Sequence, residues 1–114
     1  MPRSEIWLIN LDPTIGAEIK KTRPAVIVND DAIGILPLKI IVPITEWKER
    51  YALAPWIVRL ERDVQNGLEK SSAADTFQVR SVAQERFVRR IGTLADPAMK
   101  GIGEALAIVL SLRS

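Results

Sequence analysis

Residues 5–28 read EIWLINLDPTIGAEIKKTRPAVIV, two runs rich in Ile, Val and Trp on either side of a polar stretch. Apolar, β-branched runs bounded by turn residues predict β-strands, here over 5–11 and 25–29. Most hairpin loops have about 2–5 residues, and the polar stretch from Asp12 to Pro24 is longer than that. Long loops carried on a rigid sheet often hold functional residues. We therefore expect the functional site to include this loop.

Further short apolar runs predict a mainly β protein. They cover residues 38–44, 56–60, 72–82 and 88–94, with a single helical turn over 84–87. The run over 72–82 is predicted as one strand, straight or bent, that places Gln78 and Arg80 on one face. Val79, Val82 and Ile91 are expected to point inward. Several short strands at this spacing favour a small barrel or sandwich over a doubly wound sheet.

A helix is predicted at the C-terminal end of the chain. Asp96 is a favourable N-cap residue, and Pro97 suits the first helical position. Apolar residues then recur at helical spacing, at Met99, Ile102, Leu106, Val109 and Leu110. We expect a single domain over 1–114, because domains of about 100–150 residues are common.

The composition excludes several kinds of chemistry. With no Cys and no His, the chain cannot form disulfides, thiol nucleophiles or imidazole metal sites and bases. We expect no metal and no other cofactor. The net charge of +2 is too small to indicate nucleic-acid binding by itself. Proline and lysine interrupt the most apolar stretch, 32–45, and no signal peptide is visible, so a cytoplasmic protein without a membrane span is expected.

The loop between the first two strands carries one carboxylate, Glu18, and three cations, Lys20, Lys21 and Arg23. Such a set can hold a phosphodiester, because a planar guanidinium binds two phosphate oxygens at once. Taken alone, Arg23 has a simpler explanation, which is an ion pair with Glu18 across the loop. Lys20 and Lys21 alone are explained as solvated loop charges.

Taken together, several segments resemble the MazF/PemK family of toxins. They are 5–18 and 22–28, then 42–45, 67–72, 78–82, 86–87 and 90–94, in the order found in the family. The resemblance covers nearly the whole chain. It implies a small SH3-like, partly open barrel of the PemK/CcdB type with a C-terminal helix. It also implies a homodimer.

The same resemblance implies an activity. Proteins of this kind are sequence-specific, metal-independent endoribonucleases that cleave single-stranded RNA (mRNA) through its 2′-hydroxyl and are neutralised by a cognate antitoxin. Arg23 and Thr45 match the family's catalytic pair, and Glu18 matches a loop glutamate that is also implicated. Glu18 is our candidate general base, because carboxylates serve where imidazole is absent. The alternative is a non-enzymatic toxin of the same fold that binds and poisons a topoisomerase (gyrase).

Residues outside the catalytic set are expected to bind the RNA. They are Lys20, Lys21, Trp47, Asp75, Gln78, Arg80 and Arg86. Trp47 can stack on an unpaired base, and Gln78 can read a base edge. Each has a structural alternative, since Trp47 can cover the core and Gln78 can bond to the backbone. Many family members carry an acidic residue just before the glutamine, where this chain has Phe77.

Overall fold

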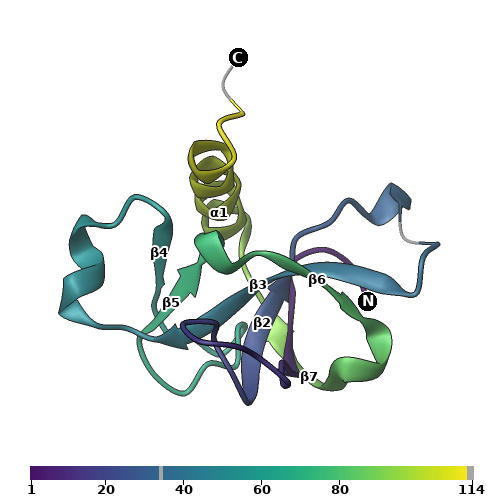
Figure 1. The fold of residues 1–114 in the computed structure, drawn as a ribbon. Helices are drawn as coiled ribbons and strands as arrows, with labels where there is room; N and C mark the ends of the chain where they lie inside the picture. Colours follow the sequence, from purple (N-terminus) through teal and green to yellow (C-terminus); the bar gives the residue numbers. More distant parts are fainter. Residues whose placement is uncertain (34, 113–114) are drawn as a thin grey trace.

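In the part of the chain that the structure describes, seven antiparallel strands wrap into a barrel beneath one helix (Figure 1). The computed structural model describes residues 1–33 and 35–112. In this part of the chain the strands are β1 (Glu5–Asn10), β2 (Thr22–Ile27), β3 (Leu38–Glu46), β4 (Ile57–Leu60), β5 (Ser72–Asp75), β6 (Arg80–Ala83) and β7 (Phe87–Thr93). The helix is α1 (Asp96–Val109). Short 3-10 turns are η1 (Asp31–Ile33), η2 (Glu49–Leu53), η3 (Thr76–Gln78) and η4 (Gln84–Arg86).

β3 is the central strand of the sheet. The strand order is β4-β5-β3-β2-β1-β7, and β6 pairs with β3 outside this path. One side of β3 pairs with β2, while the other pairs with β6 along Leu38–Ile41 and with β5 along Ile44–Glu46. In the pairings of the described residues, β4 and β7 do not join. The barrel is therefore partly open, as predicted.

The predicted single strand over 72–82 is wrong, because η3 separates β5 from β6. Pro43 of β3 lies at the gap between the two pairings and has no amide hydrogen to donate to a neighbour. Thr76 is fully buried, and both its amide nitrogen and its Oγ1 donate to the carbonyl of Trp56, at 3.1 and 2.7 Å. Gln78 therefore ends a fixed turn instead of alternating with Arg80 along a strand.

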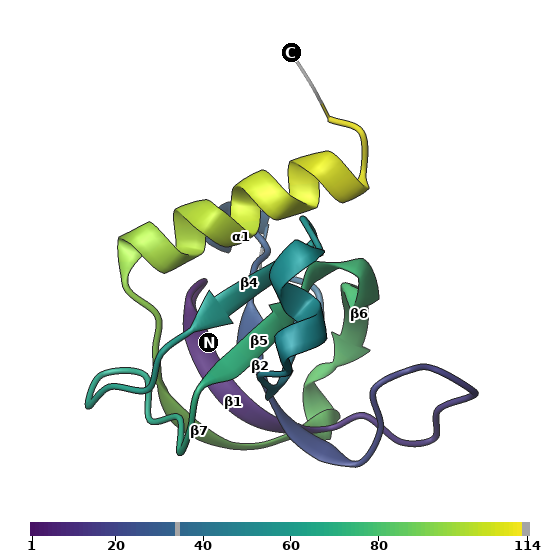
Figure 2. The same ribbon diagram turned by 90° about the vertical axis from the view of Figure 1, so that its left-hand side faces the viewer.

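The loop between β1 and β2 is shorter than predicted. β2 begins at Thr22, and Arg23 and Pro24 pair with β1 opposite Ile9 and Leu8. The loop proper covers residues 11–21, and Figure 2 shows it reaching out from the barrel. Arg23 is thus held on a strand, where its backbone position is fixed by pairing.

Side chains pack on both faces of the central strands. One cluster lies between the sheet and α1 and includes Ile6, Val26, Val42, Met99 and Ile102. The other consists of Ile9, Leu11, Ala25, Ile27, Ile41 and Val82. Complete burial of a Val, Leu or Ile side chain stabilises a fold by about 1.5–3 kcal/mol. β1, β2 and β3, buried on both faces, form a rigid base for the loops.

α1 follows the predicted apolar pattern as far as Val109, with a different cap, whereas Leu110 lies just beyond the helix and is half exposed. Ala95 occupies the N-cap position without a side-chain bond, and Asp96 is already in the first turn. A carboxylate there still interacts favourably with the helix dipole. Met99 and Ile102 are buried, as expected. No helix among the described residues is long and apolar enough to cross a membrane.

The loop between β4 and β5 is locked against β7. Asn66 is 3% exposed, donates through Nδ2 to the Glu61 carbonyl at 2.8 Å and accepts through Oδ1 from the Leu68 amide at 3.0 Å. Gly67 has a φ of +67°, and a Cβ atom there would lie 2.0 Å from the Ile91 carbonyl oxygen. Only glycine fits at this close approach.

Candidate active site

Arg23 and Thr45 lie on neighbouring strands and line one cavity of about 380 Å³. The β2–β3 register pairs Ala25 with Pro43, and continued two residues further it places Arg23 opposite Thr45. Residues opposite one another in a sheet have side chains on the same face. The structure thus brings together the two residues predicted to be catalytic.

The remaining walls of this cavity carry charges of both signs. Lys70 and Arg89 contribute cations, and Glu46 contributes a carboxylate. Lys70 Nζ lies 3.5 Å from Glu46 Oε2, so these two charges partly offset one another. Arg23 is exposed, and its Nε donates to the Lys20 carbonyl at 3.3 Å. The Arg23 guanidinium is therefore tied to the end of the loop while remaining accessible to solvent.

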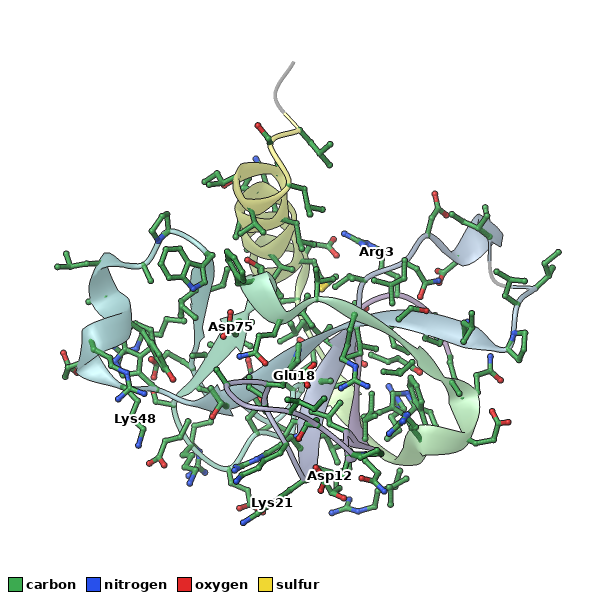
Figure 3. The ribbon with its side chains drawn as sticks, viewed as in Figure 1. Arg3, Asp12, Glu18, Lys21, Lys48 and Asp75 are labelled. Atoms are coloured by element: carbon green, nitrogen blue, oxygen red, sulfur yellow. The ribbon has the colours of Figure 1, made fainter. Side chains whose placement is uncertain are left out.

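Glu18 lines a second cavity, of about 480 Å³, together with Pro43 and Gln78. The Glu18 carboxylate accepts through Oε1 from the Ile15 amide at 2.6 Å. No ion pair joins Arg23 to Glu18 in the described part of the chain, so the simpler explanation of Arg23 is wrong. Figure 3 shows Glu18 on the loop, in front of the central strands. Pro43 and Thr45 lie two residues apart in β3, so their side chains face the same side of the sheet. The second cavity, which Pro43 lines, therefore lies on the face of Thr45.

Gln78 fastens the loop to η3. Its Oε1 accepts from the Ile19 amide at 2.6 Å, and its Nε2 donates to the Ala17 carbonyl at 3.3 Å and to Asp75 Oδ2 at 3.4 Å. Burial raises the pKa of the Asp75 carboxyl above its usual value, against the opposing effect of hydrogen bonds from Phe77 and Gln78. The backbone-bonding alternative for Gln78 is the one formed, and Asp75 contacts the loop through Gln78.

Arg80 and Arg86 hold the start of the same loop. Arg80 Nη1 donates to the Leu11 carbonyl at 3.3 Å. Arg86 Nη1 donates to the carbonyl of Asn10 at 3.1 Å and to that of Asp12. Both arginines were predicted to contact RNA. The bonds recorded here use them to position the loop, and their part in RNA binding stays a prediction.

Trp47 belongs to an aromatic and cationic cluster. Its ring meets that of Tyr51 edge to face, with centroids 5.9 Å apart, and the Arg59 guanidinium lies 4.7 Å from its centroid. Trp47 Nε1 also donates to Glu49 Oε1 at 3.3 Å. A base that stacked on the covered side of Trp47 would have to displace Arg59.

Arg59 is a cation near the site that the sequence analysis did not single out. Ala73 of β5 pairs with Thr45 on one side and with Arg59 on the other, so all three share a face. Arg59 Nε pairs with Glu61 Oε1 at 2.7 Å. A hydrogen bond from Ser71, and then the contact with Arg59, lower the pKa of the Glu61 carboxyl. The sequence holds no signal for this placement, because it depends on the register of three strands.

Lys20 and Lys21 are exposed at the end of the loop, as expected for solvated charges or for cations that meet RNA. Figure 3 labels Lys21 there. Lys21 has a φ of +70°, and its carbonyl accepts from the Leu11 amide at 3.0 Å, which closes the loop. Among the described residues, no three His, Cys, Asp or Glu side chains gather where they could hold a metal ion.

The sequence profile of PemK-like, MazF-like toxins of type II toxin–antitoxin systems matches residues 2–110. The chain belongs to this toxin family. The toxin is 33% identical over 120 residues to endoribonuclease MazF9 of Mycobacterium tuberculosis, with 100% of this chain and 99% of the relative covered. It is 28% identical over 114 residues to endoribonuclease MazF of Staphylococcus saprophyticus, covering 100% and 94%.

The fold of the toxin is shared with solved structures. An endoribonuclease in complex with its cognate antitoxin, from a mycobacterial species, superposes with a TM-score of 0.80 at 16% identity, over 100% of this chain and 98% of that one. At this identity the likeness shows the fold alone. The matches confirm the predicted MazF/PemK family and the mainly β fold with one C-terminal helix. The two relatives named above are endoribonucleases, in agreement with the predicted enzyme class.

Proposed function

We propose that this toxin is a sequence-specific endoribonuclease that cleaves single-stranded RNA without a metal ion. The observation that carries the proposal is the cavity shared by Arg23 and Thr45, which join it from neighbouring strands. In the proposed reaction the 2′-hydroxyl attacks the adjacent phosphorus and the bond to the 5′-oxygen breaks. The products are a 2′,3′-cyclic phosphate and a 5′-hydroxyl end.

The reaction needs stabilisation of a crowded, negatively charged phosphorane. Arg23 suits this role, because its guanidinium can bind two phosphate oxygens and its backbone is held in β2. The Thr45 hydroxyl can donate a further hydrogen bond to the same oxygens. Preorganised donors of this kind are worth about 3–4 kcal/mol each in a transition state. Arg23 and Thr45 together thus supply the electrostatic part of catalysis.

A base must take the proton of the 2′-hydroxyl. The arginine side chain does not lose its proton in proteins, so Arg23 is unsuited to that role. Glu18 is the proposed base. Its bond to the Ile15 amide engages Oε1, one of the two carboxylate oxygens. The leaving 5′-oxygen takes its proton from Arg23, a lysine or water.

The proposal includes two protein partners. A cognate antitoxin is proposed to lay a segment, ordered only on contact, over the active-site face, in line with the solved endoribonuclease that was obtained with its antitoxin. A second copy of the chain is proposed to complete a homodimer. In support of the dimer, apolar side chains at the end of η1, at the start of β3 and between them are exposed. They are Ile33, Ile35, Leu36, Leu38 and Ile40.

The test is to incubate the purified toxin with a long mixed RNA in excess chelator and to map the fragment ends. We expect cleavage at a recurrent short sequence with 5′-hydroxyl ends. Arg23→Ala should abolish cleavage, whereas Lys100→Ala, on the exposed side of α1, should not. Absence of cleavage by the folded protein, together with inhibition of a topoisomerase, would instead favour the poisoning activity.

The role of Glu18 has its own test. Glu18→Gln keeps an oxygen for the Ile15 amide while removing the basic carboxylate. We expect a large fall in the single-turnover cleavage rate. If Glu18→Gln cleaves at the wild-type rate while Arg23→Ala is inactive, another group takes the proton.

A further inference from the structure

Phe77 is an exposed aromatic side chain on a rigid turn. It is 68% exposed, and its only recorded ring partner in the described chain is Trp56, with centroids 6.1 Å apart. Buried Thr76 anchors the turn, and the Phe77 amide donates to Asp75 Oδ1 at 3.1 Å. These anchors use Thr76, Asp75 and main-chain groups, so they place no demand on the ring. A large apolar ring left mostly in water is unfavourable, which points to a partner that covers it.

Phe77 is one of the residues that line the second cavity, of about 480 Å³. The 11–21 loop contributes Glu18, and η3 and β6 contribute Gln78 and Arg80. Pockets of about 300–1,000 Å³ with an apolar surface and a few polar groups are typical of small-ligand sites. An aromatic surface beside groups that can meet a polar edge is the arrangement that recognises an unpaired nucleobase.

The cavity lies beside the proposed cleavage site. Pro43, in its lining, and Thr45 lie two residues apart in β3 and face the same way. This spacing corresponds to about 6.7 Å along a strand. A nucleotide next to a phosphate held at Thr45 can therefore place its base in the cavity.

We propose that this cavity binds one unpaired base of the RNA, stacked on Phe77, immediately beside the scissile phosphate. The inference rests on the proposed nuclease activity and names a determinant of its sequence preference. The turn fixes the Phe77 backbone and the Trp56 ring contacts its side chain before binding, so less side-chain entropy is lost when the base stacks. Main-chain groups of the loop, kept in position by Gln78, and the guanidinium of Arg80 meet the base edge.

The test compares Phe77→Ala and Phe77→Trp with the wild type. The matched control is Leu53→Ala, which removes an apolar side chain that is 94% exposed and lines neither cavity. The probe is a mixed-sequence single-stranded RNA whose 2′-hydroxyls are methylated, so that it binds without being cleaved. Loss of one base–aromatic stack should weaken binding roughly 5- to 150-fold in Phe77→Ala. Phe77→Trp and Leu53→Ala should bind as the wild type does.

Mapping of cleavage sites in a long mixed RNA gives the second readout. Phe77→Ala should lose the base preference at one position flanking the cut, while the other positions keep theirs. If the wild type cleaves and Phe77→Ala retains both its affinity and its full preference, the base pocket is wrong and the nuclease proposal stands. If the wild type does not cleave, the nuclease proposal fails, and the methylated RNA still tests Phe77. Weakened binding of an antitoxin segment alone would overturn the base pocket in favour of a peptide site.

Discussion

The hydroxyl of Thr45 belongs to a row of side chains that crosses four strands. Arg23 precedes it in the row, and Ala73 and then Arg59 follow. Ala73 is small, so it adds no bulk between Thr45 and Arg59. Glu61 offsets the charge of Arg59, so the positive potential that favours an approaching phosphate at the hydroxyl comes from Arg23.

At the residue scale, Thr45→Val tests the hydroxyl with little change of shape. Removal of one donor to the phosphorane should lower kcat by about 100- to 1,000-fold, with little change in KM. Thr45→Ser, which restores the hydroxyl, should recover most of the rate. Single-turnover cleavage of a short RNA that contains the mapped site measures this. A valine variant with the wild-type kcat would remove Thr45 from the catalytic set.

Asp75→Asn tests the effect of burial on a single carboxyl. Burial raises the Asp75 pKa above 3.8, so the folded state binds the proton more tightly than the unfolded state does. The resulting stability is present in acid and is lost as the pH rises from 3.8 through the raised pKa. Relative to Asp75→Asn, the wild type should therefore become less stable across that window and then level off. Urea unfolding at a series of pH values measures the difference, and a relative gain by the wild type would contradict it.

At the scale of elements, two glycines with positive φ distinguish the stability cost of backbone strain from the cost of close packing. Gly67 and Gly16 have φ values of +67° and +59°, but only at Gly67 would a Cβ atom meet another group, the Ile91 carbonyl. Gly16→Ala should cost about 1–2 kcal/mol of unfolding free energy from the backbone alone. Gly67→Ala adds overpacking and should cost about 2–5 kcal/mol. Urea unfolding of both variants measures this, and equal losses would contradict the locked loop.

Local patterns predicted most elements, because strand and helix periodicity depend on neighbouring residues. β1, β3, β4, β7 and α1 lie within two residues of their expected positions. The turn η3, which separates β5 from β6, lies opposite the gap at Pro43 between the two pairings of β3. It was missed because Pro43 belongs to another strand. The early start of β2 was missed because Thr22 and Arg23 are polar and Pro24 reads as a loop residue, although all three pair with β1.

Only part of the candidate site was predictable from the sequence. The resemblance to the MazF/PemK family identified Arg23 and Thr45, and the structure brings them together at one cavity. Arg59 comes close to Thr45 only through two strand registers, and Phe77 meets the second cavity only through the turn at η3. Such placements depend on tertiary structure, which no local pattern encodes.

At the scale of the whole molecule, several apolar side chains of η1, β3 and the residues described between them are exposed. Leu38 and Ile40 are each 43% exposed and continue the face on which Val42 and Ile44 are buried. Contiguous apolar surface on a small protein commonly marks a contact with another protein. The proposed homodimer would cover this segment.

The double substitution Leu38→Glu with Ile40→Glu tests the dimer. Two buried carboxylates without partners oppose association, so we expect a monomer where the wild type sediments as a dimer. Val64→Glu, at a fully exposed position in the β4–β5 loop, should leave the dimer intact. Sedimentation velocity at matched concentrations measures this. A wild type that sediments as a monomer, or a double variant that stays dimeric, would contradict the proposed interface.

Gln78, Arg80 and Arg86 reach the 11–21 loop and its start through carbonyl and amide groups that nearly every amino acid possesses. Mutations can therefore exchange side chains along this segment over generations while its anchorage persists. A proline at position 19 is an exception, because it would delete the amide that Gln78 accepts from. The loop can thus change its side chains without losing its attachment to η3 and β6.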